Sequence, residues 1–110
     1  MSDAEEMSVM FESLKSVFGV SAVDTEAHAR IARGAVVVDV RSPGEYASGH
    51  FGSAKNIPLD ALSVRARELS KNKPVVLYCR SGARSASAKR LLETLGFTDV
   101  YDAGGMHRLG

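Results

Sequence analysis

Apolar runs alternate along this chain with stretches in which apolar residues recur at every third or fourth position. Residues 35–40 and 75–78 are almost continuously apolar and rich in valine, as is typical of parallel strands buried on both faces. Shorter segments at 21–23, 54–58 and 99–101 predict three further strands. Strands that alternate with helices predict an α/β fold, in which helices cover both faces of a parallel sheet.

Helical spacing of apolar residues predicts the segments between these strands. One helix is expected over residues 24–33 and stops at Gly34, because glycine commonly ends helices. A second helix is expected over 59–69, and a third begins in the loop after the strand 75–78 and ends at Gly96.

A capping box predicts one short helix more sharply than its apolar pattern does. Ser42 is placed as the N-cap, Pro43 as the first helical residue and Glu45 as the third. This helix is expected to stop near Gly49, and Gly104 opens a tail at the end of the chain.

Residues 7–18 form an amphipathic pattern ahead of these elements. The pattern predicts either a helix that covers part of the core or a methionine-rich surface that docks a partner. We therefore expect an N-terminal helical extension at 1–20, followed by one domain at 21–110.

The segment after the strand 75–78 carries the clearest chemical signal. The only cysteine of the chain, Cys79, ends the apolar run, and a helix begins a few residues later. Backbone N–H groups and the helix dipole favour an anion at such a position. The loop adds two arginines, two serines and two small residues, and all of these effects are expected to favour the reactive thiolate. These loop residues are Arg80, Ser81, Gly82, Ala83, Arg84 and Ser85.

A lone cysteine is by default a small buried apolar residue. Because the residues that follow Cys79 are small or cationic, we expect instead that the thiol lies at the sheet edge and the loop lies outside the core. No histidine lies in the loop, and the sequence does not place His28, His50 or His107 beside it. A sulfur stabilised by amides and arginines suits an anionic substrate, through either sulfur transfer or phosphoryl transfer.

Composition narrows the classes of function. The chain has 14 basic and 13 acidic residues and a net charge of +1, so neither nucleic acid nor a membrane surface is expected as a partner. One cysteine allows no internal disulfide and no cysteine-rich metal site, and a free thiol fits a reducing, cytoplasmic location. The acidic N-terminus lacks the layout of a signal peptide, and no apolar run reaches membrane-spanning length.

Four segments, in the same order, resemble the single-domain rhodanese family of sulfurtransferases. They are residues 37–46, 49–58, 76–85 and 102–106. The resemblance implies a three-layer rhodanese-like fold with a five-stranded parallel sheet, which agrees with the alternating pattern. It departs after the paired glycines, where family members often continue with an aromatic residue and Leu109 stands here.

The resemblance also implies roles for individual residues. Cys79 matches the sulfur-accepting cysteine, and the loop from Arg80 to Ser85 matches the segment that surrounds the persulfide. Within that loop, Arg84 matches a position that often contacts the substrate anion. The chemistry is a double displacement that needs neither a metal nor an organic cofactor.

Two more matches lie outside the cysteine loop. Asp39 and Arg41 match the Asp-x-Arg pair of the family and are expected to support the site. His50 matches a Gly-His pair before the third strand, and we expect it to hold a loop in place.

The function implied is transfer of a sulfane sulfur from thiosulfate, or a similar anionic donor, to a thiol or cyanide acceptor. One alternative is a persulfide-carrying or regulatory module that passes sulfur to a protein partner. A second is a phosphatase of the same fold. Such phosphatases have five residues between cysteine and arginine, whereas four separate Cys79 from Arg84, and this shorter loop fits phosphate less well.

Overall fold

Short strands and helices alternate through residues 23–110, the part of the chain that the computed structural model describes. Beginning at Asp24, each strand is preceded by a helix or a turn and followed by one, as the apolar pattern predicts. The elements are α2 (Thr25–Ala32), β1 (Val36–Asp39), α3 (Pro43–Ser48), β2 (Lys55–Asn56), α4 (Leu59–Arg65), the 3-10 turn η1 (Ala66–Glu68), β3 (Val75–Cys79), α5 (Ala83–Thr94), β4 (Val100–Gly105) and the 3-10 turn η2 (Met106–Leu109).

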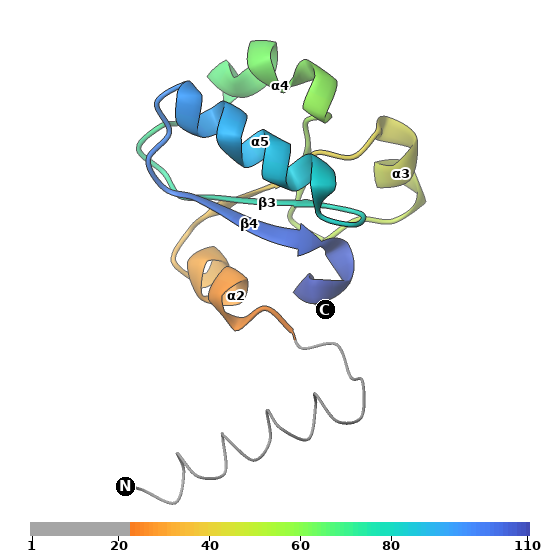
Figure 1. The fold of residues 1–110 in the computed structure, drawn as a ribbon. Helices are drawn as coiled ribbons and strands as arrows, with labels where there is room; N and C mark the ends of the chain where they lie inside the picture. The colour runs from red at the N-terminus through yellow and green to blue at the C-terminus, as the bar shows by residue number, and fades with distance from the viewer. Residues whose placement is uncertain (1–22) are drawn as a thin grey trace, which may run out of the picture.

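The strands form one parallel sheet in the order β2-β1-β3-β4. Helices α4 and α5 cover one face, and α2 covers the other (Figure 1). The α/β fold expected from the sequence is therefore confirmed. Parallel strands carry their sites at their carboxyl ends, and in this sheet those ends are the ends at which α3, α5 and η2 begin.

Alternate residues of β1 and β3 point into two separate apolar clusters. Val38 and Leu77 pack into the cluster under α4 and α5, whereas Val37 and Val76 pack into the cluster under α2. All five residues of β3 are buried. This two-sided burial explains why both segments are apolar at nearly every position.

The structure confirms the predicted start and end of α3 and the predicted start of α2. Ser42 and Glu45 form the capping box at the start of α3, and Gly49 follows its last residue. Asp24 caps α2 by accepting a hydrogen bond from the Ala27 N–H, at 3.0 Å.

The last strand is longer than predicted, and there is no tail after it. β4 runs through both glycines that were expected to open a tail, and η2 follows it, with Leu109 only 2 % exposed. A shift of register lets Leu77 pair with Asp102 but Cys79 pair with Gly105. This irregularity accommodates the extra residue in β4.

One expected helix needs correction. The segment 59–69 does not stay α-helical, because it tightens into η1 after Arg65. The sheet has four strands within the described residues, and the fifth strand expected from the sequence is the one at 21–23. Val23 is not in a strand, and the rest of the strand expected at 21–23 lies outside the described residues, as does the helix expected at 7–18.

The carboxylate of Asp39 ties the end of β1 to its surroundings. It is fully buried and pairs with Arg41, with 2.7 Å between Oδ2 and Nη2. The hydroxyl of Tyr78 on β3 donates to the same oxygen at 2.9 Å, and Tyr78 accepts from the Phe51 N–H at 3.0 Å. Burial, together with the neighbouring carboxylate, raises the pKa of Tyr78 to about 12, so the hydroxyl stays a donor.

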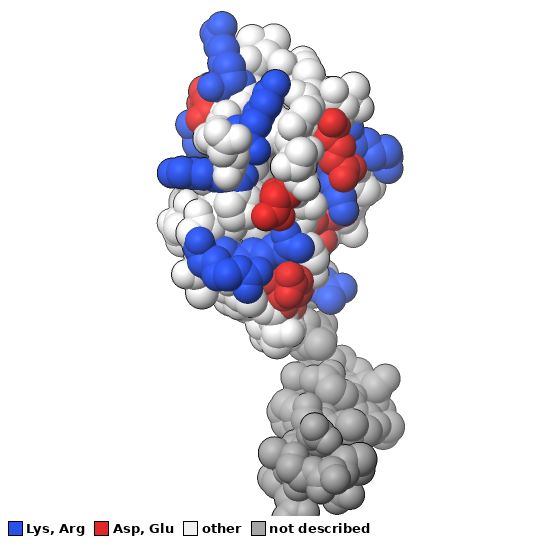
Figure 2. Space-filling model, turned by 90° about the vertical axis from the view of Figure 1, so that its left-hand side faces the viewer, with Lys and Arg blue, Asp and Glu red and all other residues white. Residues whose placement is uncertain are grey.

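Charges of both signs lie at the other end of the sheet, where the strands begin. Figure 2 views the molecule from that side, and Lys and Arg side chains lie beside Asp and Glu side chains there. Arg30 is an example, because it pairs with Glu26 at 2.8 Å and also with Asp99. Among residues 23–110, no helix is long and apolar enough to cross a membrane.

Replacing Asp39 by Asn should destabilise the fold strongly. The variant leaves the buried Arg41 guanidinium without its counter-charge, so we expect a loss of about 3 kcal/mol or more in the free energy of unfolding. Urea denaturation measures it. The matched control is Asp60→Asn at an exposed carboxylate, and a loss no larger than that of the control would contradict the role given to the pair.

Candidate active site

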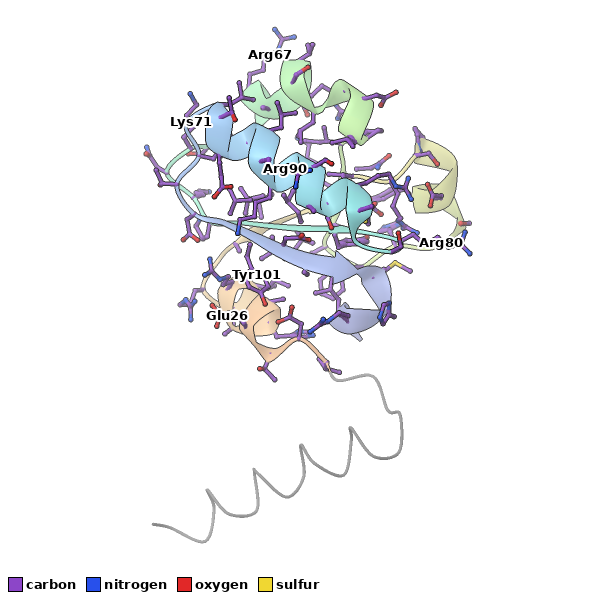
Figure 3. The ribbon with its side chains drawn as sticks, viewed as in Figure 1. Glu26, Arg67, Lys71, Arg80, Arg90 and Tyr101 are labelled. Atoms are coloured by element: carbon purple, nitrogen blue, oxygen red, sulfur yellow. The ribbon has the colours of Figure 1, made fainter. Side chains whose placement is uncertain are left out.

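Cys79 lies at the carboxyl end of β3, in the middle of the sheet. Gly105 of the neighbouring strand β4 pairs with Cys79, and α5 begins at Ala83, four residues after the cysteine. Figure 3 shows the neighbouring Arg80 at the end of the sheet opposite Lys71. The sequence therefore predicted correctly that the cysteine ends a strand and precedes a helix.

The loop after Cys79 wraps its N–H groups around the sulfur. The Gly82 N–H donates to Sγ at 2.9 Å and the Ser85 N–H donates at 3.4 Å. Gly82 has a φ of +106°, which glycine adopts without strain. The turn at Gly82 thus aims successive amides at a single atom, as in other backbone cradles for anions.

The hydroxyl of Ser85 gives the sulfur a third polar partner. Its Oγ lies 3.5 Å from Sγ, and the same hydroxyl donates to the Gly82 carbonyl at 3.1 Å. In the thiol state the S–H group donates to Oγ. When the thiol ionises, a rotation of the hydroxyl can turn its proton to the sulfur, because hydroxyl hydrogens rotate freely.

Cys79 is fully buried, which corrects the expectation of a thiol outside the core. The side chain belongs to the apolar cluster under α4 and α5, together with Leu77 and Ala88. The expectation failed because it considered only the chemistry of the loop residues. The first turn of α5 folds back over the strand end, and its Ser85 is itself fully buried.

Burial and hydrogen bonding act on the pKa of Cys79 in opposite directions. Burial raises it, whereas the Ser85 hydroxyl and the N–H groups of Ser85, Gly82 and Ser81 lower it. The hydrogen bonds outweigh burial, so the pKa lies below the ordinary value of a cysteine thiol. The predicted direction is right, and the hydrogen bonds to Sγ are the main contacts that lower the pKa.

A carboxylate from another helix holds the guanidinium of Arg84. Glu45 of α3 accepts two hydrogen bonds from Arg84, at 2.7 and 2.9 Å. Chiefly through this contact, the pKa of Glu45 falls to about 2. The sequence did not reveal the pair, because the capping box already accounted for Glu45 and 39 positions separate the two residues.

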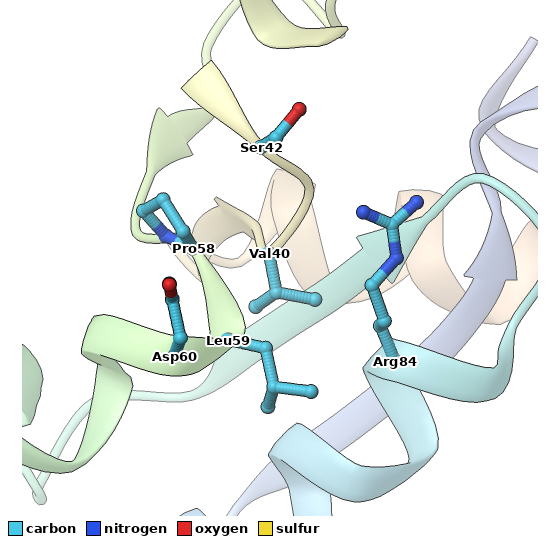
Figure 4. Close-up of a pocket in the computed structure, with 6 residues that line it drawn as sticks. All are labelled: Val40, Ser42, Pro58, Leu59, Asp60 and Arg84. Carbon is cyan, nitrogen blue, oxygen red and sulfur yellow. The ribbon is translucent and has the colours of Figure 1, made fainter. Parts of the chain in front are cut away.

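Two hollows open near this ion pair. One, of about 390 Å³, has Arg84 and Ser42 at its rim and apolar side chains at its floor (Figure 4). The other, of about 480 Å³, has a polar lining. It is formed by Arg41, Glu45, Ser48, Arg80, Met106 and His107.

The remaining predicted residues fall into two groups. Arg80, Ser81 and Ala83 are exposed at the cysteine loop. Asp39 and Arg41 lie behind it, where the Arg41 guanidinium also donates to the Gly49 carbonyl at 2.7 Å. The Arg41 side chain also lines the polar hollow.

The structure places His50 and His107 in different surroundings. His50 stacks on Tyr46 at 3.7 Å between ring centroids and lies 2.9 Å from the Tyr46 carbonyl, consistent with the structural role expected for it. His107 lines the polar hollow together with Arg80. Only the fold reveals this neighbour, because 27 positions separate His107 from Arg80. Residues 23–110 contain no cluster of three His, Cys, Asp or Glu suited to a metal ion.

The sequence of this chain is similar to those of known proteins of one family. The sequence model of the Rhodanese-like domain matches residues 23–108. The uncharacterized protein YqhL of Bacillus subtilis is 42 % identical over 79 residues, which cover 71 % of this chain and 63 % of YqhL. The thiosulfate sulfurtransferase PspE of Escherichia coli K12 is 39 % identical over 71 residues, which cover 63 % of this chain and 68 % of PspE.

A solved structure described as a rhodanese with anions from E. coli has a similar fold. Its TM-score is 0.65 and its sequence identity is 38 %, and the match covers 68 % of this chain and 91 % of that one. The matched region spans slightly less than two thirds of YqhL, at 63 %.

Ser85→Ala should raise the pKa of Cys79. The variant removes the hydroxyl that lowers this pKa most among the polar contacts, so less thiolate exists at neutral pH and the midpoint of the titration moves up. Ultraviolet absorbance of the thiolate against pH measures it, with a Cys79→Ser protein as the blank.

The matched control for that measurement is Ser87→Ala, two residues further along α5, where the hydroxyl accepts from Arg90. We expect the control to titrate like the unmodified protein. Equal midpoints for the two alanine variants would show that the Ser85 hydroxyl does not stabilise the thiolate.

Proposed function

Because the chain belongs to the rhodanese-like family, we propose that it is a sulfurtransferase whose nucleophile is the Cys79 thiolate. The observation that carries the proposal is the set of N–H groups and the hydroxyl that converge on Sγ and lower its pKa. A stabilised thiolate is what both half-reactions require, since the sulfur first attacks and later leaves.

In the first half-reaction, Sγ attacks the outer sulfur of thiosulfate. A bond forms between these two sulfur atoms, the sulfur–sulfur bond of thiosulfate breaks, and sulfite leaves with the electron pair. Neither reactant carries a proton that must be removed. A site built from N–H groups without a general base therefore suits this step.

In the second half-reaction, an acceptor attacks the outer sulfur of the Cys79 persulfide. The bond between the two persulfide sulfurs breaks, and Sγ keeps the electron pair as a thiolate. The cradle that stabilises the resting thiolate thus also stabilises the leaving group. Donors and acceptors must reach a buried sulfur. Arg80 and Ser81 are exposed, so this is the part of the loop that we expect to move when a donor or an acceptor approaches.

The relatives support this assignment and weigh against phosphoryl transfer. PspE carries the name thiosulfate sulfurtransferase, and the solved E. coli rhodanese is described as binding anions. Four residues separate Cys79 from Arg84, so the loop offers few inward N–H groups for the three equatorial oxygens of a phosphoryl group.

Incubation with thiosulfate should add one sulfur atom to the protein, at Cys79. Intact mass spectrometry measures this gain, and a sulfite assay measures the leaving group. Cys79→Ser should lose both signals completely, because a serine oxygen forms no persulfide. Sulfur uptake by the serine variant, or hydrolysis of aryl phosphates faster than release of sulfite, would overturn the assignment.

Arg84→Gln should raise the KM for thiosulfate. The guanidinium is the charged donor expected to meet the anion, and loss of one charge-assisted contact corresponds to about a tenfold weaker interaction. Steady-state sulfite release gives the KM. Arg90→Gln, at an exposed position on the same helix, is the control for general charge, and an equal KM in both variants would remove Arg84 from the donor site.

A further inference from the structure

His107 packs directly against the backbone at the cysteine loop. A Cβ added to Gly105 would lie 2.6 Å from Cε1 of His107 and 2.8 Å from the carbonyl oxygen of Arg80. The imidazole ring and the first carbonyl of the loop therefore both lie close to Gly105. Gly105 in turn pairs with Cys79 across the sheet, so the absence of a side chain at Gly105 brings the ring to the loop.

The polar hollow contains few groups that can take up a proton. Glu45 is a poor base, because Arg84 holds its pKa at about 2. Arg41 and Arg80 are cations with no proton-accepting site. Histidine is the side chain whose charge changes near neutral pH. Among the residues that line this hollow, His107 alone thus has the chemistry of a general base.

The two half-reactions differ in their need for such a base. Thiosulfate and the Cys79 thiolate react without losing a proton, whereas a thiol acceptor must become a thiolate before it attacks. A sulfurtransferase that uses thiols therefore needs a proton acceptor on the acceptor side only. The cradle around Sγ contains no such group, since it consists of N–H donors and one hydroxyl.

We propose that His107 is the general base that deprotonates a low-molecular-weight thiol acceptor bound in the hollow beside Arg80. The proposal rests on the proposed function. The imidazole takes the proton of the acceptor R–SH, and the thiolate sulfur bonds to the outer sulfur of Cys79–S–SH. The persulfide bond breaks, its electron pair stays on Sγ, and the products are R–S–SH, the Cys79 thiolate and an imidazolium that returns its proton to solvent.

The experiment follows the second half-reaction alone. Cys79 is loaded with sulfur from inorganic polysulfide, and the loaded protein is mixed with one of two thiols. The first is 2-mercaptoethanol, which is mostly protonated at neutral pH. The second is thionitrobenzoate, an aryl thiol that is already ionised. Loss of sulfur from the protein is followed by rapid quenching and intact mass spectrometry.

His107→Gln should slow transfer to 2-mercaptoethanol by about a hundredfold, the lower end of what general bases contribute. Transfer to thionitrobenzoate should change less than about threefold, because that thiol has no proton to lose. Added imidazole should restore part of the lost rate. The control is Arg108→Gln, which changes an exposed neighbour in the same turn η2 and should leave both rates unchanged.

Equal slowing with both thiols would overturn the proposal, because a merely structural role of His107 does not depend on the proton of the acceptor. Unchanged rates with both would overturn it as well. Failure of thiosulfate to load Cys79 while polysulfide succeeds would refute the proposed donor and leave this test intact. Failure of both reagents to load Cys79 would refute the nucleophile and, with it, the role of His107.

Discussion

The buried carboxylate of Asp39 is the constraint on which the active end of the sheet depends. A charge taken out of water must be compensated by partners at fixed positions. Here those partners are Arg41 and the Tyr78 hydroxyl, which belong to the loop after β1 and to the strand that ends in Cys79. One charge thereby sets the relative positions of β1, β3 and the loop around Gly49, to which Arg41 also donates.

This arrangement gives the neighbouring cysteine an unusual combination of properties. Its sulfur is fully buried in an apolar cluster, and burial by itself would favour the neutral thiol. The N–H groups of the loop reverse that preference locally, because they sit at hydrogen-bond distance and need no reorganisation when charge develops. A thiolate in such a place is shielded from bulk water and is still stabilised by hydrogen bonds.

The charged side chains around the loop are tied to one another. Glu45 caps α3 through Ser42 and also holds Arg84, so the start of a helix and an arginine of the cysteine loop share one carboxylate. The pair borders an apolar hollow on one side and a polar hollow on the other.

Much of this protein follows from its sequence alone. The apolar runs at β1 and β3, the capping box of α3 and the glycine after α2 are local signals, since they depend on residues a few positions apart. The position of Cys79 between a strand and a helix is local too. Hence the fold class, and the place of the cysteine between a strand and a helix, could be predicted from the sequence.

Only the tertiary structure decided which distant groups meet. The burial of Cys79, the hold of Glu45 on Arg84 and the approach of His107 to Arg80 join residues that lie on different elements. The length of β4 was missed for the same reason, because Gly105 continues the strand by pairing with Cys79 of β3. Caps, turns and apolar periodicity depend on residues a few positions apart, so the sequence alone determines them. Strand pairing and side-chain packing depend on several segments that are remote in the chain, so only the tertiary structure determines them.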